Sequence, residues 1–162
     1  MHVVFIVIGG VMLPSSIALA QTTLPRADSD AAFKAAGFTE HSGQWRACDD
    51  PGTAGYAPGA IESVADVNGD GLPEAVITES SSFCHGAAGV GYALVSKSGS
   101  GRWRLMSEGS GVLGFLTTKG ADGWPDIQIG GPGFCFPVER WNGREYARVR
   151  FEYDGKPCRP AN

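Results

Sequence analysis

Oxygen-bearing residues recur at every second position along residues 66–74, which read Asp-Val-Asn-Gly-Asp-Gly-Leu-Pro-Glu. Calcium is a hard ion that takes about six to eight oxygen ligands, and alternate residues of a tight loop direct their oxygens to one side. Gly71 stands at the sixth position, where calcium loops turn sharply. The spacing predicts one structural Ca²⁺, held by the side chains of Asp66, Asn68, Asp70 and Glu74 and the carbonyl of Leu72.

The loop differs from an EF-hand in two respects. Position 12 of the pattern is Ile77, where an EF-hand has a bidentate glutamate, and the flanking residues predict strands, not helices. A metal-free turn, closed by Asp and Asn side chains on their own backbone, is the alternative. Repulsion among three crowded carboxylates favours the metal. A Kd of about 10⁻⁴–10⁻³ M is expected, as in extracellular calcium modules.

The loop and the residues after it resemble the short calcium loop of FG-GAP and VCBS-type β-repeats, in which Asp-x-Asp-x-Asp-Gly-x-x-Asp leads into a strand. Asn68 and Glu74 replace two of these aspartates, and both still supply oxygen. The chain also resembles small exported bacterial proteins of unassigned function that share this loop and the segment found here at residues 123–137. The resemblance implies a β-repeat fold with structural calcium and implies no activity.

Turn-forming residues are abundant, with 24 glycines and ten prolines among 162 residues, which favours many turns and little helix. Residues 29–38 predict one short helix, because a Ser or Asp cap precedes alanines and Gly37 follows them. Hairpins are predicted around residues 98–101 and around Asn142-Gly143. We expect a mainly β fold of antiparallel strands and hairpins with one short N-terminal helix.

Two parts of the chain, residues 61–106 and 113–151, match each other weakly. Residues 70–77 align with residues 122–129, and each copy then reaches a cysteine and a hairpin at similar spacing. We interpret this pattern as a duplication that gives two related strand units. The two units are expected to pack face to face or to join in one sheet.

The second copy does not retain the metal-binding pattern. Thr118 and Gly120 occupy the positions of Asp66 and Asn68, and Lys119 lies between them. A lysine at this position opposes a divalent cation. At most one calcium ion is therefore expected.

The first twenty residues have the features of a signal peptide. An apolar stretch at residues 3–13 is too short to span a bilayer, and the small residues Ala18 and Ala20 form a cleavage pattern. A buried N-terminal strand is the alternative. With cleavage after residues 1–20, residues 21–162 would form a single soluble β-rich domain, periplasmic or secreted, with no membrane insertion.

Four cysteines follow the predicted signal, and an even number in an exported chain indicates two disulfides. A zinc site is the alternative, but it lacks a Cys-x-x-Cys pair. Four cysteines allow three pairings. We favour Cys84–Cys135, because these residues occupy matching places in the two units, which leaves Cys48–Cys158.

The formal net charge of −4 argues against binding to nucleic acid, which requires a basic face. Aromatic residues crowd the glycine- and proline-rich second half of the chain, and aromatics exposed on loops bind protein or carbohydrate. The candidate binding residues are Phe134, Phe136, Trp141 and Trp124. The domain is expected to act as a monomer with a protein or carbohydrate partner.

Residues with catalytic potential do not form a recognisable set. Cys84-His85 has the elements of a nucleophile, and a carboxylate pair for hydrolysis is available among Glu62, Glu79, Glu108 and Asp122. Nothing in the sequence fixes the distances between them. We therefore expect no enzyme, and a hydrolase with an unidentified site is the second alternative.

A binding alternative comes from two short motifs. Residues 98–103 and Thr118-Lys119-Gly120 are similar to motifs of periplasmic c-type lysozyme inhibitors. In that family the motifs belong to disulfide-bonded β-barrels that insert a loop into the lysozyme cleft. The preferred interpretation is an exported β-domain with one structural calcium, serving a binding or structural role.

Overall fold

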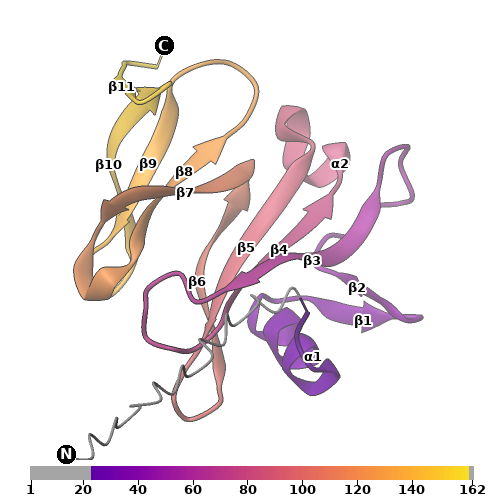
Figure 1. Cartoon of the computed structure of the whole chain (residues 1–162). Helices are drawn as coiled ribbons and strands as arrows, with labels where there is room; N and C mark the ends of the chain where they lie inside the picture. Colours follow the sequence, from indigo (N-terminus) through magenta and orange to yellow (C-terminus); the bar gives the residue numbers. More distant parts are fainter. Residues whose placement is uncertain (1–22, 161–162) are drawn as a thin grey trace, which may run out of the picture.

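The computed structural model describes residues 23–160, which fold into two antiparallel sheets and a helix (Figure 1). The predicted signal peptide, residues 1–20, lies outside the described residues. Four helical segments accompany the strands: α1 (Arg26–Ala35), α2 (Ser82–His85), η1 (Gly86–Ala88) and η2 (Ala121–Gly123). Among the described residues, no helix has the length and apolar character needed to cross a membrane.

Each sheet is a meander in which strands that follow one another in the chain also pair. The first sheet has six strands: β1 (Thr39–His41), β2 (Gln44–Arg46), β3 (Ala57–Ala65), β4 (Glu74–Ser80), β5 (Val90–Lys97) and β6 (Trp103–Ser110). The second has five: β7 (Val112–Lys119), β8 (Pro125–Gly130), β9 (Phe136–Trp141), β10 (Tyr146–Tyr153) and β11 (Lys156–Pro157). The prediction of a mainly β, antiparallel fold is confirmed.

The two sheets correspond to the two related units of the sequence. Strands β3 to β6 and strands β7 to β10 are four-stranded meanders with the same order of elements. Gly111 is the single residue between β6 and β7, so the chain leaves one sheet and enters the other within one step. The first unit is extended by β1 and β2, and the second by β11.

Strand β4 divides its side chains between two layers. Ala75 and Ile77 pack in a core cluster with Ala32 and Phe33 of α1, whereas Val76 belongs to the cluster that faces the second sheet. This is the alternation that a strand with both faces covered requires. The first sheet therefore forms the middle layer, with α1 on one face and the second sheet on the other (Figure 1).

The two sheets meet face to face through large side chains. Trp124 and Trp141 are 3% and 4% exposed, and their ring centroids lie 6.0 Å apart. They pack with Val76, Leu94 and Met106 of the first sheet. Burial of side chains of this size contributes roughly 1.5–3 kcal/mol each. Face-to-face packing is thus the arrangement of the two units.

Helix α1 begins earlier than the sequence pattern predicted. It starts at Arg26, after Pro25, and no side chain caps its N-terminus. Pro25 is compatible with this position because proline has no backbone N–H to satisfy. The helix ends at Ala35, before the predicted stop at Gly37. Its buried residues, Ala32 and Phe33, hold it against the sheet.

The disulfides join Cys48 to Cys84 and Cys135 to Cys158, so the predicted pairing of Cys84 with Cys135 and of Cys48 with Cys158 is wrong. The Cα atoms lie 6.3 Å and 5.6 Å apart, within the range for disulfides. Cys84 and Cys135 occupy matching places, after β4 and after β8, but in different units. Each pairs with a cysteine from a segment that extends its own sheet.

Candidate metal centre

The predicted calcium loop connects β3 to β4 and is folded around the carboxylate of Asp66. Its Oδ1 accepts hydrogen bonds from the backbone N–H groups of Gly69 at 2.7 Å and Asp70 at 3.1 Å. Its Oδ2 accepts one from Gly71 at 2.8 Å. An aspartate at this position organises a tight loop because a carboxylate offers about four acceptor sites. Three of these sites are used by the loop's own backbone.

Asn68 and Asp70 close the rest of the loop. The Asn68 Oδ1 accepts a hydrogen bond from the Asp70 N–H at 2.9 Å, and the Asp70 Oδ1 accepts one from the Leu72 N–H at 2.8 Å. The Asn68 amide donates to the Asp70 Oδ2 at 3.2 Å. These are the bonds of an Asx-type turn, the metal-free alternative. They also hold the oxygens of both side chains within one small loop.

Glu74, the last predicted ligand, begins β4 and is 1% exposed. Its carboxylate accepts hydrogen bonds from the Val67 N–H at 3.0 Å and the Ser96 hydroxyl at 2.8 Å. Burial raises the pKa of Glu74 to about 7; these two hydrogen bonds oppose the rise, and the charges of Asp70 and Asp66 add to it. The cause is physical, since water solvates a carboxylate better than the protein interior does.

The equivalent carboxylate in the second unit, Asp126, is neutralised by arginines. It is fully buried, and Arg140 binds it through Nε at 2.8 Å and Nη2 at 2.9 Å. Arg150 donates from Nη1 at 2.9 Å, and Thr118 donates at 2.6 Å. The Arg140 hydrogen bonds hold the pKa of Asp126 well below its usual range, although burial opposes them. Charge-assisted, bidentate bonds of this kind are among the strongest in proteins.

Within residues 23–160, the acidic residues of the first unit lack the ion-pair partners that Asp126 has in the second. Among the described residues, no lysine or arginine forms a salt bridge with Glu74, Asp66 or Asp70. Nor are three histidine, cysteine, aspartate or glutamate side chains of the described segment gathered closely enough to hold a metal ion. The predicted set, however, includes an amide and a carbonyl beside the carboxylates. Its chemistry, all oxygen and mostly anionic, fits calcium.

The loop lies directly against the second unit. A Cβ atom added to Gly123 would stand 2.6 Å from the carbonyl oxygen of Asn68, and Gly123 has a φ of +77°. Only glycine fits both the contact and the backbone conformation. Residues of this loop also line a hollow of about 370 Å³ together with the β5–β6 hairpin, Asp122 and Trp124. The loop is therefore part of the joint between the two sheets.

The four aromatic residues predicted to bind a partner have different positions. Trp124 and Trp141 belong to the inter-sheet core, so their side chains are not available at the surface and this part of the prediction is wrong. Phe134 is 75% exposed and makes an edge-to-face contact with Tyr153 at 5.1 Å. Phe136 is half-buried and lies 5.9 Å from the same tyrosine ring. Of these four residues, only Phe134 presents a large apolar surface to solvent.

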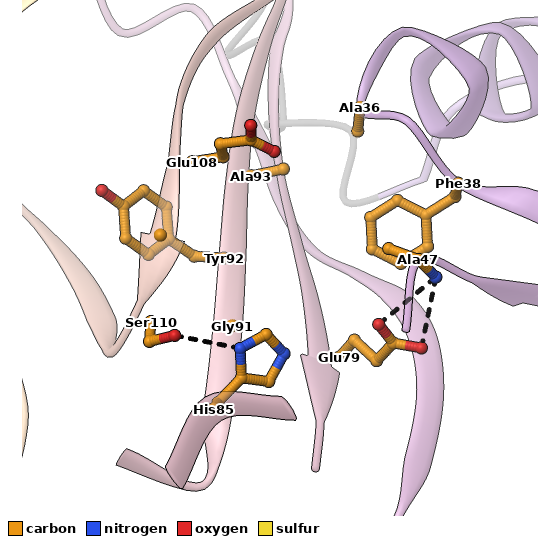
Figure 2. Close-up of a pocket in the computed structure, with 11 residues that line it drawn as sticks. Ala36, Phe38, Ala47, Glu79, His85, Gly91, Tyr92, Ala93, Glu108 and Ser110 are labelled. Atoms are coloured by element: carbon orange, nitrogen blue, oxygen red, sulfur yellow. Dashed lines mark hydrogen bonds between the residues drawn. The ribbon is translucent and has the colours of Figure 1, made fainter. Parts of the chain in front are cut away.

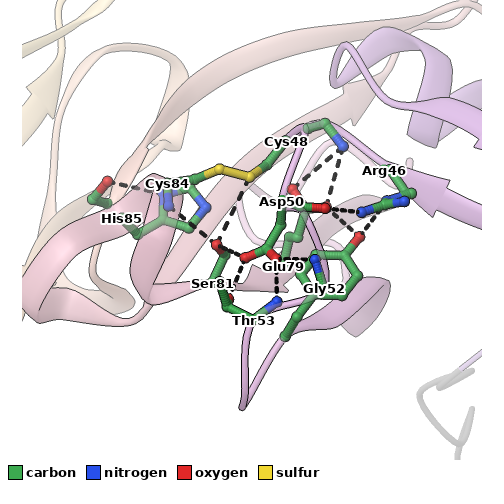
Figure 3. Close-up of a disulfide and its surroundings, with 12 residues drawn as sticks. Arg46, Cys48, Asp50, Gly52, Thr53, Glu79, Ser81, Cys84 and His85 are labelled. Atoms are coloured by element: carbon green, nitrogen blue, oxygen red, sulfur yellow. Dashed lines mark hydrogen bonds between the residues drawn. A yellow bond between two sulfur atoms is a disulfide. The ribbon is translucent and has the colours of Figure 1, made fainter.

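A second group of buried acids surrounds the first disulfide (Figure 3). Burial by itself raises the pKa of Asp50, but hydrogen bonds from Ser81, Thr53 and Gly52 outweigh it and hold the pKa below its usual range. Glu79 is 3% exposed; both of its carboxylate oxygens accept a long hydrogen bond of 3.3 Å from the Ala47 N–H, and Oε1 also accepts one of 3.0 Å from the Tyr56 hydroxyl. The sequence pattern did not indicate that either acid is buried.

Two residues named in the catalytic and inhibitor hypotheses form other interactions in the structure. Cys84 is in a disulfide, so its sulfur is not a free nucleophile. The Thr118 hydroxyl, part of the inhibitor-like motif, points inward to Asp126. The arginine network around Asp126 was missed, although the alignment of residues 70–77 with 122–129 placed Asp126 opposite Glu74 and could have identified it.

Comparison of the chain with models of known protein families, with curated proteins and with solved structures found no match. Function must therefore be argued from the site itself. Two features carry most information: the oxygen-rich loop that ends at the buried Glu74, and the buried carboxylate of Glu79.

Proposed function

We propose that this chain is an exported binding domain whose fold is stabilised by one calcium ion in a loop of the FG-GAP and VCBS type. The observation that carries the proposal is the difference between two equivalent carboxylates. Asp126 is buried with two arginines, whereas Glu74 is buried beside Asp66 and Asp70, and no lysine or arginine of residues 23–160 forms a salt bridge with it. A buried charge is costly unless it is paired.

Calcium would supply in the first unit the positive charge that arginines supply in the second. Asp66, Asn68, Asp70 and Glu74 would provide side-chain oxygens, and Leu72 its carbonyl. Because the Asn68 backbone packs on Gly123, ordering of the loop would also stiffen the junction of the two sheets. The proposed role of the metal is structural, and no reaction is assigned to it.

Export is supported by two features. The sequence has a predicted signal peptide, and the two disulfides are of the kind that persists outside the reducing cytoplasm. A periplasmic or extracellular location would also supply calcium at concentrations that fill a weak site. The exposed Phe134 supports a role in binding a protein or carbohydrate by a monomeric domain.

Thermal unfolding with and without calcium tests the proposal. Calcium at ten times its Kd stabilises a protein by about 1.4 kcal/mol, which raises Tm by roughly 5 °C in a domain of this size. Magnesium at the same concentration should have less effect, because this loop offers more oxygens than magnesium accepts from proteins. An unchanged Tm of the wild-type protein in calcium would refute the site.

Matched variants assign the effect to the loop. Asp70→Asn removes one ligand charge and keeps an oxygen to accept the Leu72 N–H, so it should lower the calcium affinity without unfolding the loop. Asp122→Asn is the same change at the equivalent position of the second unit. It should leave the calcium response as in the wild type. Equal responses from the two variants would place the metal elsewhere.

A further inference from the structure

A cavity of about 320 Å³ lies on the helix-facing side of the first sheet, beyond the end of α1 (Figure 2). It lies apart from the calcium loop, and none of its lining residues belongs to that loop. Its volume is within the range of small-molecule sites, roughly 300–1,000 Å³. The walls come from six parts of the chain: the segment after α1 (Ala36 and Phe38), the segment after β2 (Ala47), β4, α2, β5 and β6.

Small residues create this space. The β5 part of the lining is Gly91, Tyr92 and Ala93; the Gly91 position leaves room for the ring of His85, and Ala36, Ala47 and Ala93 stand where larger side chains would fill the volume. Protein interiors are normally close-packed, and a space of this size lined by small residues is uncommon. Phe38, which is 7% exposed, supplies an apolar wall. The cavity thus has room for the body of a small organic molecule.

The acid at the base of the cavity is buried without an ion-pair partner. Glu79 is 3% exposed, and its bonds come from the Ala47 N–H and the Tyr56 hydroxyl. Arg46 is linked to it only through that hydroxyl, to which Arg46 Nε donates at 2.8 Å. Among the described residues no salt bridge includes Glu79. Its carboxylate therefore retains acceptor capacity that the described residues do not use.

A second carboxylate lies across the cavity. Glu108 pairs in register with Ala93, and residues paired in register point to the same face of a sheet. Glu108 is exposed, so it stands at the mouth while Glu79 stands at the base. No lysine or arginine is among the lining residues. The two carboxylates therefore make the electrostatic potential inside the cavity negative.

His85 completes the polar lining. Its ring lies on Gly91, so closely that an added Cβ would overlap it. The Nδ1 is 3.0 Å from the Ser110 hydroxyl, and the Nε2, on the side of the ring toward Glu79, is buried with no hydrogen-bond partner among the described residues (Figure 2). With the proton on Nδ1, Nε2 is an acceptor that lacks a donor.

We propose that this cavity binds a small organic cation, a primary ammonium carried on a short apolar body. The ammonium has three N–H donors, and the cavity offers acceptors on Glu79, Glu108 and His85. No lysine or arginine of residues 23–160 lines the cavity to repel the ammonium. The apolar body lies against Phe38 and Ala93. Phe38 adds a ring face to which cations are attracted.

The apolar part of the lining distinguishes this ligand from a bare metal ion. The cavity of about 320 Å³ includes Ala36, Phe38 and Ala93, which offer a metal no side-chain ligand but can contact the organic body of an amine. A carboxylate or phosphate ligand is opposed by both glutamates.

Titration with benzylamine, followed by NMR, tests the proposal. The amide signals of Ala47, Gly91 and Ala93 should shift together and saturate. Benzyl alcohol has nearly the same shape without the charge. It should bind at least about tenfold more weakly, the factor expected for loss of one charged hydrogen bond. Nα-acetyl-lysine methylamide presents the same ammonium on a peptide, and the tighter of the two ligands identifies a free amine or a lysine side chain as the source.

Three charge-removing variants make the test specific. Glu79→Gln keeps an acceptor for Ala47 and Tyr56 and should weaken benzylamine binding by about tenfold. Glu108→Gln is at an exposed position, so the fold is retained, and binding should weaken several-fold. Glu62→Gln removes the same charge from an exposed site on β3 and should bind as the wild type does.

Three outcomes would overturn the proposal. These are changes in NMR signals confined to residues outside the cavity, equal affinities for benzyl alcohol and benzylamine, and an unchanged benzylamine affinity in both Glu79→Gln and Glu108→Gln. The titration is repeated with and without calcium at equal ionic strength. Because the cavity shares no lining residue with residues 66–74, loss of the calcium response would leave benzylamine binding intact.

Discussion

Replacing Glu74 by glutamine should stabilise the calcium-free protein at pH 8, although Glu74 is among its most buried residues. Glutamine has the same shape and no charge. Its side-chain oxygen accepts the hydrogen bond from Val67, and the Ser96 hydroxyl, which now donates to Glu74, can turn to accept one from the amide. The substitution therefore removes the buried charge and keeps the hydrogen bonds.

The expected size follows from the pKa of Glu74, which rises from 4.5 to about 7 on folding. At about 1.36 kcal/mol for each pKa unit, ionised Glu74 costs the folded state about 3 kcal/mol above pH 7. Folded Glu74 holds its proton more tightly than unfolded Glu74, so this cost develops as the pH rises from about 4.5 to about 7. Below that window both states are protonated and the cost is absent.

Urea unfolding in EDTA, followed by the fluorescence of the buried Trp124 and Trp141, measures the effect. The measurements are made at about pH 4, 6 and 8, which lie below, within and above the range over which the cost of ionised Glu74 develops. Other carboxylates titrate as well, so the informative quantity is the difference between variant and wild type at each pH. This difference should be near zero at the lowest pH and reach about 3 kcal/mol in favour of Glu74→Gln at the highest.

Calcium should reverse the order of stability. In the wild type, the bound metal neutralises the charge of Glu74. The glutamine variant has no carboxylate at this position to bind the metal, so its advantage in stability should shrink or change sign. A variant that is less stable than the wild type in EDTA at pH 8, by the same amount as at pH 4, would refute the reasoning. It would mean that the charge of Glu74 is already compensated inside the protein.

Three further predictions follow from the same structure. Asp126→Asn removes the buried carboxylate that Arg140 and Arg150 bind and should destabilise the protein by about 1.5–3 kcal/mol in urea unfolding, because both arginines are partly exposed and stay solvated; calcium should not restore this loss. Gly123→Ala forces a Cβ toward the Asn68 carbonyl and should lower both Tm and calcium affinity, as seen by thermal unfolding across a calcium titration. Peptide mapping without reduction should recover Cys48 linked to Cys84, and replacing both by serine should cost about 2–5 kcal/mol; a peptide linking Cys84 to any other cysteine would contradict the fold.

The strand content was predictable because it depends on local properties of the chain. Turn residues at 98–101 and at Asn142-Gly143 lie in the two hairpins that the sequence indicated, between β5 and β6 and between β9 and β10. The alternation of the β4 side chains between two layers likewise follows from the two-residue period of a strand. The start of the helix was less predictable, because Pro25 begins it without a capping side chain.

The disulfides and the tryptophans show where local reasoning ends. Matching positions of Cys84 and Cys135 in the repeat suggested that they meet, but equivalent positions in two packed sheets are not neighbouring positions. Trp124 and Trp141 lie near glycines and prolines, a context that suggested exposed loops. Packing of the second sheet on the first buried both.

The sequence alone determined the chemistry available in residues 66–74, because the identity and spacing of oxygen donors are local properties. It also determined the duplicated pattern of strands. The tertiary structure decided which charges are costly: Asp126 pairs with two arginines from β9 and β10, whereas no lysine or arginine in the described part of the chain pairs with Glu74. It also placed Glu79, Glu108 and His85 around one cavity, since burial and distance between remote residues arise only when the strands pair and the layers pack.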